Sequence, residues 1–152
     1  MVGESRWCAR SGSPGSHRVR DSVLMDVLGA GHILVIGDTP AVVTRLRAQL
    51  QAEGFEVKGA SAARQGERLA LGDDVTLIVL DRMVSWDDGL DLLMLVRQRR
   101  PGLPIIVLSA RAEVADRIAA FDAGATDFLA KPFSPGELVA RVRAQLRRAA
   151  WA

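Results

Sequence analysis

The sequence contains a single cysteine, Cys8, so the chain offers no intramolecular disulfide and no cysteine metal cluster. It also lacks any run of about 18 uncharged apolar residues, which excludes a membrane-spanning helix. Arginines at positions 6, 10, 18 and 20 interrupt the N-terminal segment before the apolar stretch of a signal peptide can form. The sequence therefore predicts a cytoplasmic protein that makes no use of a membrane.

Lysine is scarce, because only Lys58 and Lys131 stand among the 20 basic residues. The net charge is only +2, and no Lys/Arg block with interleaved aromatic residues occurs, so the chain itself is not expected to bind nucleic acid. What is present suits a soluble globular protein. Hydrophobic residues make up 49% and charged residues 25% of the 152 positions, enough for one domain with a buried core.

The composition divides the chain into three parts. Residues 1–30 are rich in Ser, Gly and Arg without a helix or strand period, and we expect a disordered leader whose native start could also be Met25. Residues 31–149 are expected to form the folded domain, and residues 150–152 a short tail.

Within the folded part, short apolar runs alternate with longer amphipathic ones, which predicts strand–helix repeats and a parallel sheet. The expected strands are 33–36, 55–58, 76–80, 105–108 and 128–130. The first expected helix runs from Pro40 to a stop at Gly54, and the others span 62–71, 89–99, 113–123 and 135–148. This is an α/β, (βα)5 doubly wound arrangement.

Polar residues follow four of these strands where each strand ends. They are Asp38, Asp81, Ser109 and Lys131. In an open α/β sheet, ligands bind beyond the carboxyl ends of the strands, so these side chains are expected to converge. Such a set supports phosphoryl transfer to the Asp81 carboxylate.

Each of the other residue types has a task in that reaction. The two carboxylates and a main-chain carbonyl form a plausible Mg²⁺ site. Lys131 supplies a positive charge and Ser109 a hydroxyl donor to phosphate oxygens.

Several short motifs carry a resemblance to a known family. They are ILVIGDTP at 33–40, LDRM at 80–83, DGL at 88–90, LSA at 108–110, GATDF at 124–128 and KPF at 131–133. From about residue 33 to 148 the chain resembles the response-regulator receiver (CheY-like) domains of bacterial two-component systems. The resemblance implies a flavodoxin-like sheet with strand order 2-1-3-4-5, and a signalling switch rather than a metabolic enzyme.

The resemblance also implies roles for individual residues. Asp81 accepts a phosphoryl group from a sensor histidine kinase, and Ser109 and Lys131 contact that group. Mg²⁺ is bound by Asp38, Asp81 and the backbone carbonyl of Met83. The Lys131–Pro132 peptide bond is implied to be cis.

The sequence departs from the family where adjacent acids usually follow the first strand, because Gly37 and Thr39 flank Asp38. The acid missing at Gly37 normally reaches the metal through water, and losing such a partner typically costs about 10 to 100-fold in metal affinity. Weakened Mg²⁺ binding is the expected result. The alternative is a degenerate receiver that binds partner proteins without phosphorylation.

Two positions resemble the switch pair of the family. The Ser109 hydroxyl is implied to move toward the phosphate while the Phe128 ring turns inward. The change is then read on the face made by the fourth helix, the fifth strand and the fifth helix.

The segment 124–148 is most similar to the OmpR/PhoB subfamily, whose receivers precede a winged-helix DNA-binding domain. Asp127, Glu137 and Arg141 are candidates for ion pairs across a homodimer that forms on phosphorylation. DNA contact is expected only through an effector domain, which this chain does not include.

Other interpretations of the same residues remain open. Asp38 could cap the helix that begins near Pro40, with or without binding metal. A flavin or nucleotide binder on the same fold is a third hypothesis, although no Gly-rich phosphate loop follows the first strand.

Overall fold

The computed structural model describes residues 32–82 and 86–150. The leader expected over 1–30, the end of the expected tail and Met83 lie outside the described residues.

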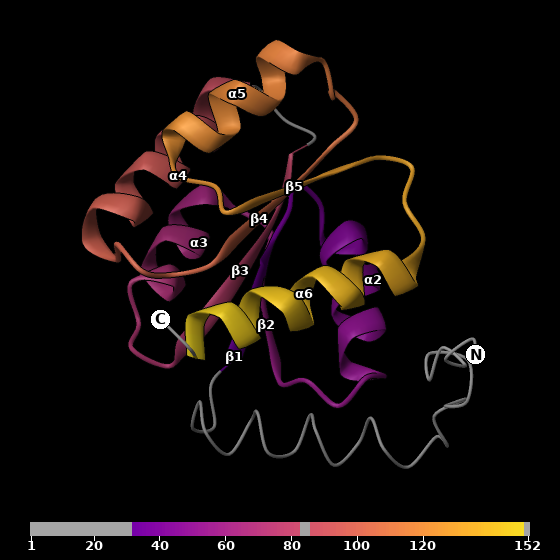
Figure 1. Cartoon of the computed structure of the whole chain (residues 1–152). Helices are drawn as coiled ribbons and strands as arrows, with labels where there is room; N and C mark the ends of the chain where they lie inside the picture. The colour runs from indigo at the N-terminus through magenta and orange to yellow at the C-terminus, as the bar shows by residue number, and fades with distance from the viewer. Residues whose placement is uncertain (1–31, 83–85, 151–152) are drawn as a thin grey trace, which may run out of the picture.

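Five parallel strands alternate with five helices along the chain (Figure 1). The strands are β1 His32–Ile36, β2 Val57–Ala60, β3 Val75–Arg82, β4 Ile105–Ser109 and β5 Asp127–Ala130. The helices are α2 Pro40–Gln51, α3 Ala63–Ala70, α4 Trp86–Arg99, α5 Val114–Ala123 and α6 Pro135–Ala150. The strands form one sheet in the order β2-β1-β3-β4-β5. The predicted α/β, flavodoxin-like fold with strand order 2-1-3-4-5 is confirmed.

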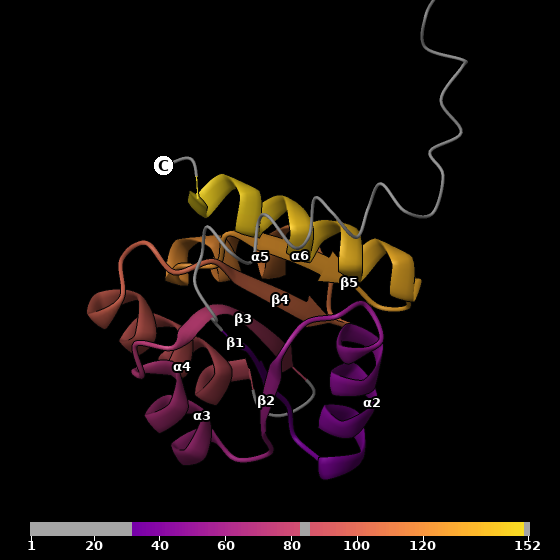
Figure 2. The ribbon, with the colours of Figure 1, turned by 90° about the horizontal axis from the view of Figure 1, so that it is seen from below.

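The helices cover both faces of the sheet, α2 and α6 on one side and α3, α4 and α5 on the other (Figures 1 and 2). Successive strand residues point to opposite faces, so Ile33 and Val35 join the core under α2 and α6. Leu34 and Ile36 join the core under α3 and α4. Because both faces are covered, the central strands are continuous aliphatic runs.

The second strand begins two residues later than predicted. Phe55 is buried, but it precedes β2 and its N–H donates to the carbonyl of Leu50 at the end of α2. Gly59 lies inside β2, although glycine is a poor strand former. A Cβ at Gly59 would stand 2.5 Å from a Val43 methyl, so glycine allows α2 to pack closely on this strand.

The helix α4 also differs from the sequence pattern, because it begins at Trp86 rather than at position 89. Gly89 therefore lies in the first turn of the helix instead of marking its start. None of the helices within 32–82 and 86–150 is long and apolar enough to cross a bilayer.

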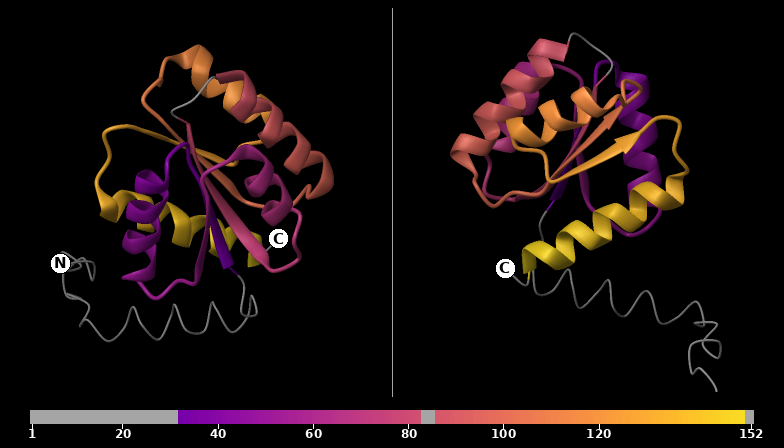
Figure 3. Two further views of the ribbon diagram at one scale, coloured as in Figure 1. Left: turned by 180° about the vertical axis from the view of Figure 1, so that it is seen from behind. Right: turned by 45° about the horizontal axis from the view of Figure 1, so that its top comes forward.

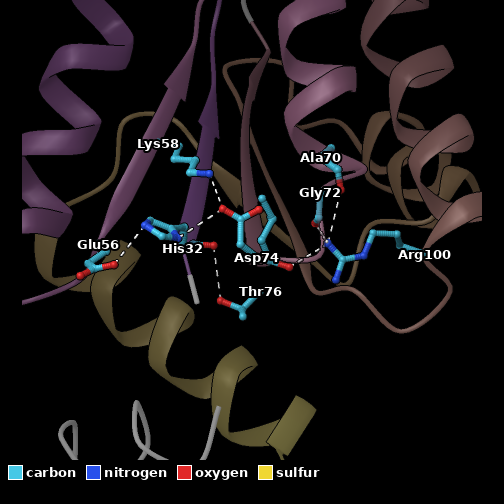
Figure 4. A network of polar contacts seen from close by, with 9 residues as sticks. His32, Glu56, Lys58, Ala70, Gly72, Asp74, Thr76 and Arg100 are labelled. Atoms are coloured by element: carbon cyan, nitrogen blue, oxygen red, sulfur yellow. Dashed lines mark hydrogen bonds and ion pairs between the residues drawn. The ribbon is translucent and has the colours of Figure 1, made fainter. Parts of the chain in front are cut away.

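Charged side chains form ion pairs and hydrogen bonds at the edge of the sheet where the strands begin (Figure 4). His32 lies between Glu56, at 3.0 Å, and Asp74, at 3.5 Å, and Lys58 also pairs with Asp74. Arg100 donates to the carbonyls of three residues, one at the end of α3, one in the turn that follows and one at the start of β3. These carbonyls belong to Ala70, Gly72 and Val75. This set of contacts, called the amino-edge network below, joins β1, β2, α3, β3 and α4.

Candidate functional site

The carboxyl ends of the strands meet at the opposite edge of the sheet (Figure 3). The strand order reverses between β1 and β3, since β1 is followed by β2 on one side while β3 begins the run to β5. Asp38 follows β1 and Asp81 is the penultimate residue of β3. The two carboxylates therefore flank the switch point where ligands bind in such sheets.

Asp81 is buried and forms an ion pair with Lys131. Its side chain is 3% exposed, and the Lys131 ammonium nitrogen lies 2.5 Å from Asp81 Oδ1. A buried carboxylate requires such a partner, because an unpaired charge away from water is costly. The structure thus brings together two of the predicted site residues across 50 positions of sequence.

Ser109 is the last residue of β4 and is 1% exposed. Its hydroxyl oxygen accepts a hydrogen bond from the Arg111 N–H at 3.1 Å, and its carbonyl accepts one from the Lys131 N–H at 2.9 Å. The second bond fixes the ends of β4 and β5 side by side. The Lys131–Pro132 peptide is cis, as predicted.

Asp38 and Asp81 line one pocket of about 240 Å³. Asp38 itself is half-buried. The helix α2 is capped by Thr39, whose hydroxyl oxygen accepts from the Val42 N–H at 3.3 Å, so the interpretation of Asp38 as the helix cap was wrong. The other residues of the pocket wall come from β1, β3 and the starts of α3 and α4. They are Ile36, Gly37, Ser61, Ala62, Ala63, Leu80, Arg82, Gly89 and Leu92.

Gly37 is buried at the point where the family usually carries an acid. A Cβ built on Gly37 would lie 3.8 Å from the Asp81 Cβ and 3.2 Å from Val43 Cγ2. A carboxylate at this position would therefore stand next to Asp81, in moderately tight space. Glycine leaves the pocket with one acid fewer.

The two carboxylates of this pocket fit a magnesium ion whose remaining ligands are mainly water and phosphate oxygens. Two carboxylates line the pocket, and Mg²⁺ is commonly bound by one or two carboxylates with water and phosphate oxygens completing its shell. Across the described ranges, no three His, Cys, Asp or Glu side chains gather closely enough to form a metal site on their own. The third predicted ligand, the Met83 carbonyl, lies outside the described residues.

Phe128, the predicted switch aromatic, is buried in the core beneath α4 and α5 and is 8% exposed. It lies in β5 opposite Val107 of β4. The Arg117 guanidinium stands 5.7 Å from the centre of its ring, within range of a cation–π contact. The ring therefore connects the end of the sheet near Ser109 with α5.

The three candidate dimer residues form ion pairs within the chain. Arg141 contacts Asp127 at 3.0 Å and Glu137 at 3.2 Å. Burial lowers the pKa of Arg141, but the hydrogen bonds to the two carboxylates outweigh it and leave the pKa above its ordinary value. The side chains of Arg141 and Glu137 are 37% and 46% exposed, so both remain accessible from outside.

Sequence reasoning missed two features of this end of the molecule. Arg82, directly after Asp81, lines the pocket and is 7% exposed. In the sequence, Arg82 could have been noticed as a single arginine at the end of an aliphatic strand. On α5, Val114, Ile118 and Phe121 expose 72%, 54% and 47% of their surface. Their spacing at i, i+4 and i+7 places them on one helix face.

Comparison with known proteins agrees with this geometry. A family model for the response regulator receiver domain matches residues 33–143. The response regulator MprA of Mycolicibacterium vanbaalenii is 44% identical over 116 residues, which are 76% of this chain and 50% of that protein. The transcriptional regulatory protein HprR of Escherichia coli is 43% identical over 116 residues, 76% of this chain and 52% of its own. Both relatives belong to the OmpR/PhoB family.

The same likeness extends to solved structures. A putative response regulator from Chloroflexus aurantiacus matches with a TM-score of 0.70 and 34% identity, over 78% of this chain and 98% of that one. The chain spans about half the length of the curated relatives it matches. From the family match, the shared strand order and the placement of the site, the chain belongs to the response regulator receiver domains, which are signalling switches of two-component systems rather than metabolic enzymes.

Proposed function

We propose that Asp81 accepts a phosphoryl group from a sensor histidine kinase in the cytoplasm, with Mg²⁺, and that the resulting acyl phosphate switches the surface formed by α5, β5 and α6. The observation that carries this proposal is the buried Asp81 carboxylate, held by Lys131 at 2.5 Å and sharing a pocket with Asp38. An aspartate on the surface would not be expected to meet these partners from two other strand ends.

The proposed reaction moves one phosphoryl group. A carboxylate oxygen of Asp81 attacks phosphorus, and the new O–P bond forms as the P–N bond to the kinase histidine breaks. The electron pair of that bond returns to the imidazole nitrogen, which takes up a proton from solvent. Asp81 changes from a monoanion to an acyl phosphate dianion.

Residues already in place would stabilise the added charge. The Lys131 ammonium orients the carboxylate and, after transfer, would contact a phosphate oxygen. The Ser109 hydroxyl oxygen accepts from Arg111 N–H, so its own hydrogen is available for donation to a second phosphate oxygen.

Asp38, Asp81 and the Met83 carbonyl are the proposed metal ligands. When bound, Mg²⁺ would neutralise charge on the incoming phosphoryl oxygens. Because Gly37 supplies no carboxylate, we expect the metal to bind about 10 to 100-fold more weakly than with an acid there.

The switch would pass from Ser109 to Phe128. If the Ser109 hydroxyl turns toward the phosphate, it gives up its contact with the Arg111 N–H and changes the space around the Phe128 ring. Phe128 has no hydroxyl, so its effect would run through packing and through the Arg117 guanidinium above its ring. The packing around the Phe128 ring and its contact with Arg117 both involve α5.

The outer face of α5, β5 and α6 is the proposed surface of a phosphorylation-dependent homodimer. Val114, Ile118 and Phe121 provide the apolar area, and Asp127, Glu137 and Arg141 provide charges of both signs. A two-fold dimer needs such a self-complementary patch, because each residue meets the same surface on the partner copy.

Ile118→Asp should abolish dimerisation and leave phosphorylation of the monomer intact. Sedimentation velocity with beryllofluoride, a phosphoryl mimic, measures this directly. Met94→Asp is the matched control, since Met94 is 49% exposed on α4, outside the proposed surface. Equal loss of dimer in both variants would reject this surface.

Regulation of transcription is the output we propose, because HprR and similar relatives are transcriptional regulatory proteins. DNA contact would belong to an effector domain and not to this receiver. The second candidate function is a degenerate receiver that works without phosphate, favoured by the buried glycine at position 37.

Calorimetric titration with beryllofluoride and Mg²⁺ tests the proposal and separates the two candidates. The switch predicts stoichiometric binding to the native protein and none to Asp81→Asn. A native protein that binds no beryllofluoride even at high Mg²⁺ would favour the degenerate receiver.

A further inference from the structure

Arg97 joins the ends of two neighbouring helices, α4 and α5. It stands in the last turn of α4, and its Nε and Nη2 atoms both donate to the carbonyl of Gly124, the residue that ends α5, at 3.0 Å and 2.6 Å. Its Nη1 atom donates to the carbonyls of Arg100 and Pro101 at 3.0 Å and 2.8 Å. One half-buried side chain therefore holds three carbonyls, which come from the turns that follow the two helices.

Gly124 shapes the other side of this contact. Its φ is 124°, a conformation that other residues rarely adopt, and its N–H donates to the carbonyl of Phe121 at 3.0 Å as the helix ends. A Cβ at Gly124 would stand 2.8 Å from both Cβ and Cγ of Arg97. The glycine therefore allows the stem of Arg97 to lie directly against the backbone that its guanidinium binds.

The residues that follow Gly124 bind the same end of α5 to the sheet. The Ala125 N–H donates at 3.0 Å to the carbonyl of Ala120, whose side chain is fully buried. The N–H and the hydroxyl of Thr126 both donate to the carbonyl of Ile105, at 2.8 Å and 3.0 Å. The carboxyl end of α5 is thus held to α4 on one side and to the start of β4 on the other.

The amino end of α5 is held in another way. Its hydrogen bonds join residues that are close together in sequence. Arg117 Nε donates to the carbonyl of Ala112 at 3.1 Å, and the Glu113 N–H donates to the Asp116 carboxylate at 3.2 Å. All residues of α5 are described, and the single fully buried one lies in its second half, whereas most side chains over 114–118 are exposed. A segment with few buried contacts opens at low cost in free energy, so the amino end is the one suited to move.

We propose that Arg97 is a positioning residue of the switch, which anchors α5 at Gly124 so that phosphorylation of Asp81 tilts the helix about this end. The inference rests on the proposed function and adds a fixed point to it. The Ser109 hydroxyl oxygen accepts from the Arg111 N–H shortly before α5 begins, so a rotation of that hydroxyl acts on the amino end of the helix. With the carboxyl end anchored, a small displacement at the amino end becomes a defined tilt of the exposed apolar face of α5.

Amide hydrogen exchange of the ligand-free protein, followed by mass spectrometry with single-residue resolution, tests the anchor. Helix ends ordinarily fray, yet the amides of Gly124 and Ala125 should exchange more slowly than those of Ile118 and Ala119 in the native protein. Arg97→Met keeps most of the stem and removes the hydrogen bonds, so exchange at Gly124 and Ala125 should become about tenfold faster or more. Arg97→Lys offers fewer donors in a different geometry and should fall between the two.

Arg99→Met is the matched control, because Arg99 also stands in the last turn of α4 and is exposed. It should leave the exchange rates of α5 at their native values. Circular dichroism confirms that each variant is folded, and Arg97→Lys provides an independent test if the Arg97→Met protein is not.

The same measurement with beryllofluoride and Mg²⁺, at a protein concentration too low for dimers, follows the tilt itself. In the native protein, exchange should change over residues 114–118 and stay nearly constant at Gly124 and Ala125. In Arg97→Met the change should extend over the whole helix. A purely structural role of Arg97 would alter the ligand-free rates but not the distribution of this response.

Sedimentation velocity at higher protein concentration then measures the consequence for assembly. The beryllofluoride-dependent dimer of Arg97→Met should dissociate about tenfold more readily than the native dimer, because a surface that is not held in one place must be ordered on binding. The rate of phosphorylation at Asp81 should stay at its native value, since the contacts of Arg97 lie at the edge of the sheet where β4 and β5 begin.

The outcomes separate this inference from the proposed function. Native exchange rates at Gly124 and Ala125 in both Arg97 variants would overturn the anchor and leave phosphorylation of Asp81 untouched. An equal response to beryllofluoride at the two ends of native α5 would contradict the tilt. A native protein that binds no beryllofluoride would overturn the proposed function and the tilt that rests on it, whatever the ligand-free rates.

Discussion

The two edges of the sheet use charged residues in opposite ways. At the amino edge, Asp74 pairs with Lys58 and His32, and its side chain is 43% exposed. At the carboxyl edge, Asp81 pairs with Lys131 while its side chain is only 3% exposed. The first aspartate stands in water that screens its partners, whereas the second is held away from water beside a pocket.

This difference indicates which edge is built for stability and which for chemistry. Exposed ion pairs contribute little each, about 0 to 1 kcal/mol, and the amino-edge network gains more from the hydrogen bonds of Arg100 to backbone carbonyls. Buried charges around a pocket are costly and are retained where they have a task. Disturbing each edge separately should therefore affect different properties.

The largest effect is expected at the carboxyl edge from Lys131→Met. Loss of the ammonium removes the cation from Asp81 and from the phosphate oxygens, so the phosphorylation rate should fall by about 100-fold or more. Lys58→Met is a well-matched control, because it removes the other lysine at the amino edge. Quenched-flow or gel assays with acetyl phosphate measure both rates. Similar losses in the two variants would contradict the division between the edges.

Arg100→Met should produce the reverse pattern. Arg100 donates to the carbonyls of Gly72 at 2.9 Å and Val75 at 2.8 Å, and its loss should lower the free energy of unfolding by about 2 kcal/mol. Urea denaturation measures this change, with exposed Arg99→Met as control. The phosphorylation rate of the folded protein should be unchanged, and a large drop in that rate would show that the edges are coupled.

Gly37→Asp adds a third carboxylate at the carboxyl edge, next to Asp81. Mg²⁺ affinity is expected to rise by about tenfold or more. The new Cβ would lie 3.2 Å from Val43 Cγ2, so stability should fall by about 1 kcal/mol. Gly37→Asn causes the same crowding without the charge. If both variants bind Mg²⁺ as the native protein does, the missing acid is not what weakens the site.

The smallest effect is expected from Asp74→Asn, and it depends on pH. The hydrogen bond from Lys58 holds the pKa of Asp74 below its ordinary value of 3.8. A lowered folded-state pKa means that the charged form stabilises the protein above that value, and that this contribution disappears as pH falls through the folded pKa. Thermal melts should show a slightly lower Tm for the variant at neutral pH and equal Tm values in strong acid. A difference in Tm that persists in acid would show that Asp74 stabilises the protein through packing rather than through its charge.

Much of the site could be predicted because strand ends are encoded locally. Three of the predicted strands are aliphatic runs, and a parallel sheet brings their last residues to one edge. That reasoning predicts that Asp38, Asp81, Ser109 and Lys131 converge at one edge. The structure confirms the fold, and in it Asp81 forms an ion pair with Lys131.

The features that the sequence did not predict depend mainly on contacts between segments that lie far apart along the chain. Gly89 resembled a helix start, yet α4 begins at Trp86 and brings Gly89 against the Arg82 guanidinium. Likewise, the predicted strand 55–58 stops before Gly59, whereas β2 continues through it, and glycine at this position allows the close approach of Val43 from α2. Thr39 rather than Asp38 caps α2, a choice between adjacent residues that composition does not decide.

Intact-protein mass after incubation with acetyl phosphate and Mg²⁺ is the most direct test of phosphorylation at Asp81, with Asp81→Asn treated in parallel. We expect one added phosphoryl group on the native chain and none on the variant. No adduct on the native chain at high Mg²⁺, or an equal adduct on Asp81→Asn, would contradict it.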